Sequence, residues 1–261
     1  MKISIIIPAH NEEKRIVKTL EAYYKVFKEK KENKTIKEFE IIVVANACKD
    51  KTAESVDKFR KKFKEIKLLD FEEAGKGFAV KEGFKEALSS KADLIGFVDA
   101  DMATPPEAFY SLVKNIRDYD GVIGSRYIKG SVLEPKPPFI RTAASRIFNF
   151  IIRSLFLFNF RDTQCGAKLF RKEAVEKVLA KLNMTQWAFD IDLLYNAKKS
   201  GARIKEHQIF WRDIEGSKIN LKKASTQMLL AVLQLRILNS RFKRSWKFFK
   251  PLAGALYRLV K

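Results

Sequence analysis

The sequence is poor in histidine and cysteine and has no long uncharged apolar run. Its two histidines, His10 and His207, exclude a histidine-rich zinc site. Its two cysteines, Cys48 and Cys165, lie far apart, so we expect no disulfide framework and a reducing compartment. A spanning helix needs about 18 or more consecutive apolar residues, and none is expected here. Because the chain opens on a strand-like apolar run, we expect no signal peptide either.

Basic residues are in large excess and are unevenly distributed. The 261 residues include 52 Lys and Arg against 31 Asp and Glu, a formal net charge of +21. This excess indicates an anionic partner: a nucleic acid, an anionic lipid or a phosphorylated substrate. The mixed run from Lys25 to Lys37 is typical of a solvated face. By contrast, residues 135–161 carry five basic residues and residues 219–261 carry ten, with no acidic residue in either stretch.

The first half of the chain alternates between strand-like and helix-like patterns. Continuous apolar runs predict buried strands at residues 3–7, 39–44 and 94–98. Helical patterns lie between them, at residues 12–29, 52–63 and 78–88. Repeated strand–helix–strand units predict an α/β fold with a mostly parallel sheet flanked by helices. In such a fold a nucleotide-type ligand binds at the carboxyl ends of the strands.

The alternation weakens after Gly124. Helical patterns cover residues 141–160, 190–199, 222–238 and 241–259, and strand-like patterns cover residues 168–170 and 205–211. The last two helical patterns are basic and amphipathic. No repeat or low-complexity linker interrupts the chain, so we predict one catalytic domain, residues 1–219, and a helical extension, residues 220–261.

An acidic motif, Asp99-Ala100-Asp101, directly follows the third apolar run. It precedes Thr104-Pro105-Pro106-Glu107, which is a strong helix start. Two carboxylates separated by one residue can point the same way from an extended segment. They are hard oxygen ligands suited to Mg²⁺ or Mn²⁺, which would bridge to a diphosphate. The sequence therefore predicts a metal site at Asp99 and Asp101.

Two further motifs suit phosphate binding. Gly75-Lys76-Gly77 opens a helical pattern, where glycines allow a phosphate to approach closely and Lys76 adds positive charge. An ordinary glycine turn would give the same pattern. Arg126 follows the strand-like Val122-Ile123 and is therefore expected at the same sheet edge. An arginine there can bind a phosphate or form a surface salt bridge.

Together these motifs resemble family 2 glycosyltransferases of GT-A fold. The residues that carry this resemblance are Ile6–Glu13, Gly75–Gly77 and Asp99–Asp101. Asp162–Phe170 and Trp187–Leu194 are similar to signatures of polyprenyl-phosphate glycosyltransferases, and Trp211–Lys218 looks most like the dolichyl-phosphate β-glucosyltransferase branch. The resemblance runs from Lys2 to about Lys223, and its ordered motifs make a chance match improbable.

The resemblance implies roles for individual residues. The residues that it implies in nucleotide-sugar binding are Pro8, Asn11, Glu12, Asn46, Asp50, Lys76, Asp99 and Ala100. It implies that Asp101 binds the metal. On the acceptor and sugar side it implies Arg126, Arg141, Asp162, Gln164, Trp187 and Asp190, with Arg146 as a competing candidate for Arg141. Two positions depart from the family pattern. Ala45-Asn46 replaces the usual Asp-Asp pair, which affects nucleobase recognition, and Ala103 replaces a glutamine that often ligates the metal.

The family resemblance also implies a mechanism, an inverting single displacement. An acceptor phosphate monoester has a second pKa of about 6, so it attacks as a dianion and needs no strong general base. Arg126 and Arg141 would orient it, while Mg²⁺ or Mn²⁺ and Lys76 would stabilise charge on the departing nucleoside diphosphate. Asp190 stays open as either an acceptor-side orienting group or a base.

A prenyl acceptor explains the two basic, apolar stretches. Aromatic residues such as Phe148 and Phe150 stand beside Arg146 and Arg153, and Trp246 stands in a similar basic setting. Helices of this kind rest in the headgroup layer, where each cationic side chain contributes about 1 kcal/mol. We therefore expect peripheral binding at the cytoplasmic face of a membrane. The alternative is that these helices pack as core or as an oligomer interface, and the sequence leaves the oligomeric state open.

The substrates are less sharply defined by the sequence than the reaction. The resemblance of residues 211–218 favours UDP-glucose as donor and a polyprenyl or dolichyl phosphate as acceptor. GDP-mannose as donor and a soluble glycan as acceptor are the alternatives within the same enzyme class. A basic nucleic-acid-binding protein is the alternative from another class, because aromatic and basic residues alternate near the C-terminus. The Asp99–Asp101 edge argues against it, since without metal it repels phosphate.

Overall fold

A seven-stranded sheet forms the centre of the molecule. The computed structural model describes residues 1–184, 186, 188–212 and 221–240. The strand order is β3-β2-β1-β4-β7-β5-β8. The strands are β1 (Lys2–Ala9), β2 (Glu38–Asn46), β3 (Ile66–Phe71), β4 (Leu94–Phe97), β5 (Gly121–Ser125), β7 (Lys168–Arg171) and β8 (Ile204–Gln208). Two short strands, β6 (Val132–Leu133) and β9 (Phe210–Trp211), pair separately.

The apolar runs form the central strands because both of their faces are covered. In β1, Ile5 and Ile7 pack into one layer of the core and Ile6 packs into the other, and all three are completely buried. This alternation follows from the two-residue period of a strand. β1 pairs in parallel with both β2 and β4. The predicted α/β fold with a mostly parallel sheet is confirmed.

One strand runs against the others. β7 pairs antiparallel with β4 on one side and with β5 on the other. Its first residue, Lys168, therefore lies opposite Phe97 and Ile123, near the carboxyl ends of β4 and β5. The loop that precedes β7 reaches the same sheet edge as the loops that follow the parallel strands.

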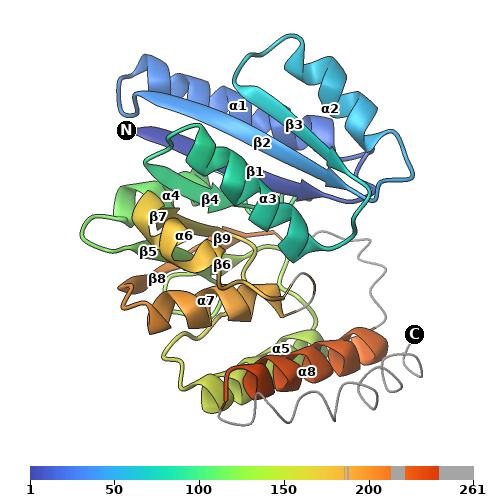
Figure 1. The fold of residues 1–261 in the computed structure, drawn as a ribbon, viewed down its shortest axis with the longest axis vertical. Helices are drawn as coiled ribbons and strands as arrows, with labels where there is room; N and C mark the ends of the chain where they lie inside the picture. The colour runs from blue at the N-terminus through green and yellow to red at the C-terminus, as the bar shows by residue number, and fades with distance from the viewer. Residues whose placement is uncertain (185, 187, 213–220, 241–261) are drawn as a thin grey trace.

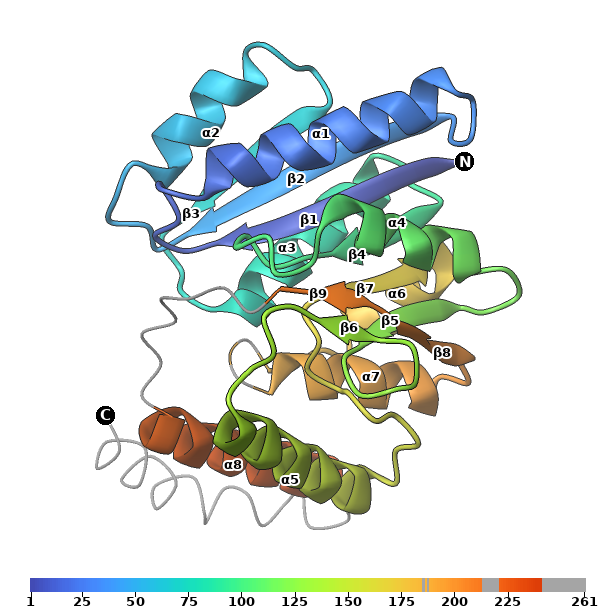
Figure 2. The same cartoon turned by 180° about the vertical axis from the view of Figure 1, so that it is seen from behind.

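Helices cover the two faces of the sheet (Figures 1 and 2). One face carries α1 (Ile16–Glu32), α2 (Thr52–Arg60) and α4 (Pro106–Asn115), and the other carries α3 (Lys76–Ser89), α6 (Lys172–Leu179) and α7 (Phe189–Lys199). The first layer is rich in aromatic contacts; Tyr23 and Phe27, for example, stack at 6.3 Å between ring centroids. Pro106 begins α4, as the sequence predicts.

Two further helices, α5 (Phe139–Phe156) and α8 (Leu221–Leu238), lie side by side beyond the sheet (Figures 1 and 2). α5 ends four residues before the predicted limit, because Leu157 adopts a positive φ of 52° and the chain turns back. Phe158 consequently packs into the core with Phe156, and Val232 of α8 joins the same cluster. The predicted helix at residues 241–259 lies outside the described residues. Among the described helices, none combines the length and apolarity that crossing a bilayer requires.

Candidate active site

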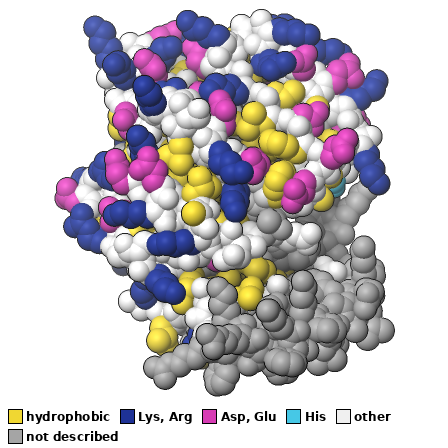
Figure 3. All heavy atoms as spheres, viewed as in Figure 1, with side chains coloured by type: hydrophobic (Ala, Val, Ile, Leu, Met, Phe, Trp, Pro, Cys, Tyr) yellow, Lys and Arg dark blue, Asp and Glu magenta, His cyan; other side chains and the backbone are white. Residues whose placement is uncertain are grey.

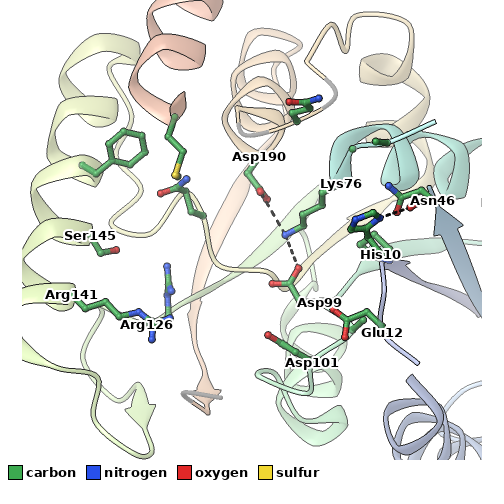
Figure 4. Close-up of a pocket in the computed structure, with 18 of the residues that line it drawn as sticks. His10, Glu12, Asn46, Lys76, Asp99, Asp101, Arg126, Arg141, Ser145 and Asp190 are labelled. Atoms are coloured by element: carbon green, nitrogen blue, oxygen red, sulfur yellow. Dashed lines mark hydrogen bonds and ion pairs between the residues drawn. The ribbon is translucent and has the colours of Figure 1, made fainter. Parts of the chain in front are cut away.

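A cavity of about 750 Å³ opens at the carboxyl ends of the parallel strands and extends to α5 and α8. Figure 4 shows two ends of it: carboxylates and Lys76 gather near the loops after β1 and β4, and two arginines lie toward α5. Its wall consists of Pro8, His10, Glu12, Asn46, Ala74, Gly75, Lys76, Asp99, Ala100, Asp101, Arg126, Arg141, Ala144, Ser145, Phe148, Gln164, Gln186, Asp190 and Met228. A single continuous space therefore joins the predicted donor and acceptor sides.

The loop after β2 is tied to its neighbours by hydrogen bonds. His10 Nδ1 lies 2.8 Å from the backbone oxygen of Asn46, and because a carbonyl only accepts, Nδ1 carries the proton. In the orientation that satisfies both of its ends, the Asn46 amide donates to the Ala9 oxygen at 3.0 Å and accepts from the Gly75 N–H at 2.9 Å. The Asn46 side chain thus links β1 to the start of α3. Gly75 has a φ of 133°, which favours glycine at this position.

Lys76 lies between two carboxylates in the cavity wall. Its Nζ is 2.6 Å from Asp99 Oδ1 and 3.9 Å from Asp190 Oδ2 (Figure 4). Burial alone would lower the pKa of the Lys76 ammonium, but the charges of Asp99 and Asp190 outweigh burial and raise it. Lys76 is therefore a permanent cation at the start of α3, where backbone N–H groups also favour an anion.

Asp101 and Glu12 add negative charge beside Asp99. Burial and then the charge of Asp99 raise the pKa of Asp101, and burial raises the pKa of Glu12 although Arg15 pairs with it at 2.7 Å. The Ala103 N–H donates to Asp101 at 2.9 Å and fixes that carboxylate. Crowded carboxylates whose pKa values are raised favour a bound cation.

The donor set fits a metal that shares its ligands with a substrate. In the part of the chain that the structure describes, no group of three or more His, Cys, Asp and Glu side chains is arranged to hold a metal by itself. Mg²⁺ characteristically takes one or two protein carboxylates and completes its shell with phosphate oxygens and water. Asp99 and Asp101 can supply those carboxylates, so the residues present fit a divalent cation on a diphosphate.

Arg126 is held rigidly at the other end of the cavity. Its Nε and Nη2 donate to the two oxygens of Asp162 at 2.7 and 2.9 Å. Tyr127 and Trp211 lie 5.3 and 5.4 Å from the guanidinium carbon, measured to the ring centroids. Asp162 is fully buried; burial would raise its pKa, but the Arg126 charge outweighs burial and lowers it. The guanidinium is therefore oriented without help from a ligand.

α5 brings Arg141 and Ser145 to the same end. Both lie in the cavity wall one helical turn apart, and the Tyr127 hydroxyl hydrogen-bonds the Ser145 hydroxyl at 2.6 Å. Arg146, the competing candidate, is exposed, does not line the cavity and lies 6.0 Å from the Tyr127 ring centroid. The geometry thus supports Arg141 as the second acceptor-side arginine.

Most of the residues implied by the family resemblance line the cavity. They are Pro8, Glu12, Asn46, Lys76, Asp99, Ala100, Asp101, Arg126, Arg141, Gln164 and Asp190. Asn11 and Asp50 do not line the cavity. Asn11 instead accepts a hydrogen bond from the Lys49 N–H, and Asp50 accepts one from the Thr52 N–H at the start of α2. Asp162 lies beneath the wall under Arg126. Trp187 is outside the described residues.

Sequence reasoning missed several wall residues. They are His10, Ala74, Ala144, Ser145, Phe148, Gln186 and Met228. Ser145 could have been found, because it stands four positions after Arg141 on the same helix. Met228 could not, because nothing in the sequence indicates that α8 packs beside α5.

Comparison with known proteins gives consistent matches. Residues 4–179 match the model of the family described as glycosyl transferase family 2. The chain is 34% identical over 245 residues to a dolichyl-phosphate β-glucosyltransferase of Dictyostelium discoideum, covering 90% of this chain and 73% of the relative. It is 30% identical to the human dolichyl-phosphate β-glucosyltransferase, covering 84% of this chain and 69% of that one.

Solved structures share the fold at low identity. A mannosyltransferase from Pyrobaculum calidifontis, in complex with GDP-Man and Mn²⁺, superposes with a TM-score of 0.62 at 18% identity, over 98% of this chain and 69% of its own. Glucosyl-3-phosphoglycerate synthase from Mycobacterium tuberculosis, in complex with Mn²⁺, UDP and phosphoglyceric acid, superposes with a TM-score of 0.63 at 14% identity. The match covers 92% of this chain and 80% of the synthase.

Proposed function

The chain belongs to glycosyl transferase family 2, and from this premise we propose that it transfers glucose from UDP-glucose to a polyprenyl or dolichyl phosphate. The curated relatives at 34% and 30% identity carry the name dolichyl-phosphate β-glucosyltransferase. The observation that carries the proposal is one continuous cavity: its carboxylate end suits a metal-bound diphosphate and its arginine end suits a second phosphate. A glycan acceptor would not need two arginines at this end.

On the donor side, three side chains of this chain have defined tasks. Lys76, held charged by its carboxylate neighbours, neutralises the diphosphate as negative charge grows on the leaving group. Asp99 and Asp101 would hold Mg²⁺ or Mn²⁺, which supplies Lewis-acid stabilisation of the same charge when bound. Related solved structures contain Mn²⁺, which supports a divalent cation without choosing between the two.

On the acceptor side, the arginines orient the nucleophile. A phosphate monoester with a second pKa of about 6 is largely dianionic near neutrality and attacks without a strong base. Asp162 engages two of the five guanidinium N–H groups of Arg126, so others remain to bind the acceptor phosphate. Arg141 adds a second positive charge from α5. Fixing the dianion near the anomeric carbon supplies most of what this displacement requires.

We further propose that the protein binds the cytoplasmic face of a membrane through α5. Ile147 and Phe150 are 62% and 68% exposed, and Arg146 and Arg153 are exposed on the same side of the helix. An apolar stripe flanked by arginines suits the boundary between headgroups and acyl chains. The free thiols of Cys48 and Cys165 suit a reducing compartment.

The test is a transfer reaction with purified protein. Polyprenyl phosphate is supplied with UDP-glucose or with GDP-mannose, with or without Mg²⁺ or Mn²⁺, and glycolipid is followed by mass spectrometry. We expect glucosylated lipid from UDP-glucose and no product from GDP-mannose, and we expect transfer only when a divalent cation is present. Transfer activity should fall about 100-fold or more in Asp101→Ala. Asp57→Ala, which removes a partly exposed carboxylate on α2 outside the cavity wall, is the matched control and should remain active.

Other outcomes would redirect the proposal. Mannosylated lipid from GDP-mannose would keep the reaction and change the donor. Donor binding without glycolipid from either nucleotide sugar would overturn the lipid-phosphate acceptor. Full activity in the presence of a chelator would overturn the metal requirement.

A further inference from the structure

Lys168 is a lysine with no exposure to solvent. Its side chain is 0% exposed, and its Nζ donates to the Cys165 oxygen at 2.6 Å and to Asp190 Oδ1 at 2.5 Å. The Phe97 ring centroid lies 5.4 Å away. An isolated buried ammonium group is strongly unfavourable, so it needs a counter-ion. The contacts identify Asp190 as that counter-ion.

Asp190 is shared between two lysines. Its Oδ1 contacts Lys168 in the core, while its Oδ2 lies 3.9 Å from Lys76 Nζ in the cavity. Lys76 in turn contacts Asp99 at 2.6 Å, so positive and negative groups alternate from the core to the metal-binding edge (Figure 4 shows the part from Asp190 to Asp99). We call these four residues the charge ladder. Its members come from β7, α7, α3 and the loop after β4.

The surroundings of Asp190 are mainly cationic. Lys168 faces it from β7, Lys76 from α3, and Arg126 acts on it from the end of β5. Burial would raise the pKa of Asp190, but the charges of Lys168 and Lys76 outweigh burial and lower it. Protonation of Asp190 would leave Lys168 as a buried cation without a counter-ion. Asp190 is therefore poorly suited to accept a proton.

We propose that Lys168 is a positioning residue that keeps Asp190 an anion, so that Asp190 holds Lys76 against the donor diphosphate instead of acting as a general base. This inference rests on the proposed function. It assigns a task to a lysine that the donor and acceptor residues described above do not include. A site whose acceptor-side wall carboxylate, Asp190, is committed to two lysines suits an acceptor that is already anionic, such as a phosphate, and not a sugar hydroxyl.

A double-mutant cycle tests this inference. The four proteins are the unaltered chain, Asp190→Asn, Lys168→Met and the double variant. We expect Asp190→Asn to lose about 100-fold in kcat/KM, because Lys168 becomes unpaired and Lys76 loses a partner. The double variant removes both buried charges and should recover at least about 10-fold of that loss. If Asp190 were the general base, the double variant would be as inactive as Asp190→Asn, which would overturn the inference.

Separate measurement of KM and kcat in Lys168→Met distinguishes a positioning role of Lys168 from a purely structural one. Misplacement of Lys76 in Lys168→Met should raise the donor KM by about 10-fold and leave the acceptor KM within about two-fold. A merely structural lysine would lower kcat with the folded fraction, measured by thermal unfolding, and leave the donor KM unchanged; that result would also overturn the inference.

Donor binding provides a readout that does not depend on transfer. Calorimetric titration of UDP-glucose with Mn²⁺ should show weaker binding in Lys168→Met than in the unaltered chain, by about 10-fold. If the unaltered chain binds donor but makes no glycolipid, the proposed acceptor fails while the charge ladder is still tested. Equal donor affinity in the two proteins would overturn the ladder whatever the acceptor.

Discussion

At the scale of single residues, the site is organised before any substrate arrives. Arg126 illustrates this, because its guanidinium is fixed by two hydrogen bonds to a fully buried carboxylate and by two flanking aromatic rings. A fixed donor loses little conformational freedom when it binds a phosphate. The buried pair also makes Asp162 important for stability, although Asp162 itself lies outside the cavity wall.

Replacing Asp162 should therefore destabilise the fold. Asp162→Asn leaves the Arg126 guanidinium, which is 17% exposed, without its counter-ion, and we expect a loss of about 3–5 kcal/mol in the free energy of unfolding. Urea unfolding at pH 7 measures this loss. Asp57→Asn is the control: this carboxylate is partly exposed and pairs with Arg60 and Lys61 at the surface, so the free energy of unfolding should change by less than about 1 kcal/mol.

The same pair gives a dependence on pH whose sign follows from the direction of the pKa shift. The folded-state pKa of Asp162 is lowered, whereas the unfolded value is about 3.9. The stabilisation by the charged carboxylate is thus fully present above about pH 4 and is lost as the pH falls through the folded-state pKa. Between pH 5 and pH 3, Asp162→Asn should lose less stability than the unaltered chain; an equal loss in both would contradict this.

Residue roles were harder to predict than residue positions. Asp99 and Asp101 follow an apolar strand, so their place at the sheet edge could be predicted from the sequence. Asp50 also follows a strand, but its oxygens accept hydrogen bonds from the Glu13 N–H and from the Thr52 N–H at the start of α2. Lys168 reads as a surface-type residue in the sequence and is buried in the structure. Which polar groups are satisfied by neighbours depends on tertiary contacts, and a linear pattern does not contain these contacts.

At the scale of elements, the sequence predicted the strands with two covered faces, but it did not identify β3 and did not indicate the direction of β7. β1, β2 and β4 are mainly apolar runs, and their approximate limits follow from the sequence. β3 is only partly buried, so its run was too mixed to be identified. The reversed direction of β7 is set by its pairing with β4 and β5. The four residues of β7 contain no sequence pattern that indicates the direction of the strand. The end of α5 depends on the left-handed Leu157.

The exposed stripe of α5 can be tested with vesicles. A carboxylate at Ile147 or Phe150 would have to be carried into the acyl boundary, so Ile147→Glu and Phe150→Glu should each weaken binding to anionic phospholipid vesicles by about 10-fold. Co-sedimentation measures this. Tyr119→Glu is the matched control, because it also replaces an exposed apolar side chain, at 36% exposure, away from α5. Equal weakening by all three would show a general charge effect and contradict the role of α5.

At the scale of the whole molecule, the excess of positive charge is distributed in two ways. Figure 3 shows Lys and Arg interleaved with Asp and Glu over the face that carries α3 and α6. Such mixed charge is largely self-compensating at the surface. Most of the net charge lies in residues 135–161 and 219–261, which contain 15 of the 52 basic residues and none of the 31 acidic ones. Long-range attraction to an anionic surface should come mainly from these stretches.

Salt should therefore weaken membrane binding without abolishing it. The Debye length falls from about 10 Å at 0.1 M to about 3 Å at 1 M salt, which screens the basic stretches but leaves the apolar contact of α5 intact. We expect binding to anionic vesicles to fall about 10-fold or more between 0.1 and 1 M NaCl and to level off at a residual affinity. In Phe150→Glu the residual binding at 1 M should disappear; its persistence would mean that α5 is not the apolar contact.

The position of the antiparallel strand β7 affects how the donor and acceptor preferences of such a chain can change in evolution. Every donor-side residue of the cavity precedes residue 102, and Arg126, Arg141, Ser145 and Gln164 all follow residue 125. The two halves meet where β7 enters the sheet beside β4, and the contact of Lys76 with Asp190 crosses this seam. A gene fusion joined between α4 and β5 would exchange one binding half as a unit. Homologous recombination at that point can therefore pair an existing donor preference with a new acceptor, provided the first half keeps Lys76 and the second half keeps Asp190.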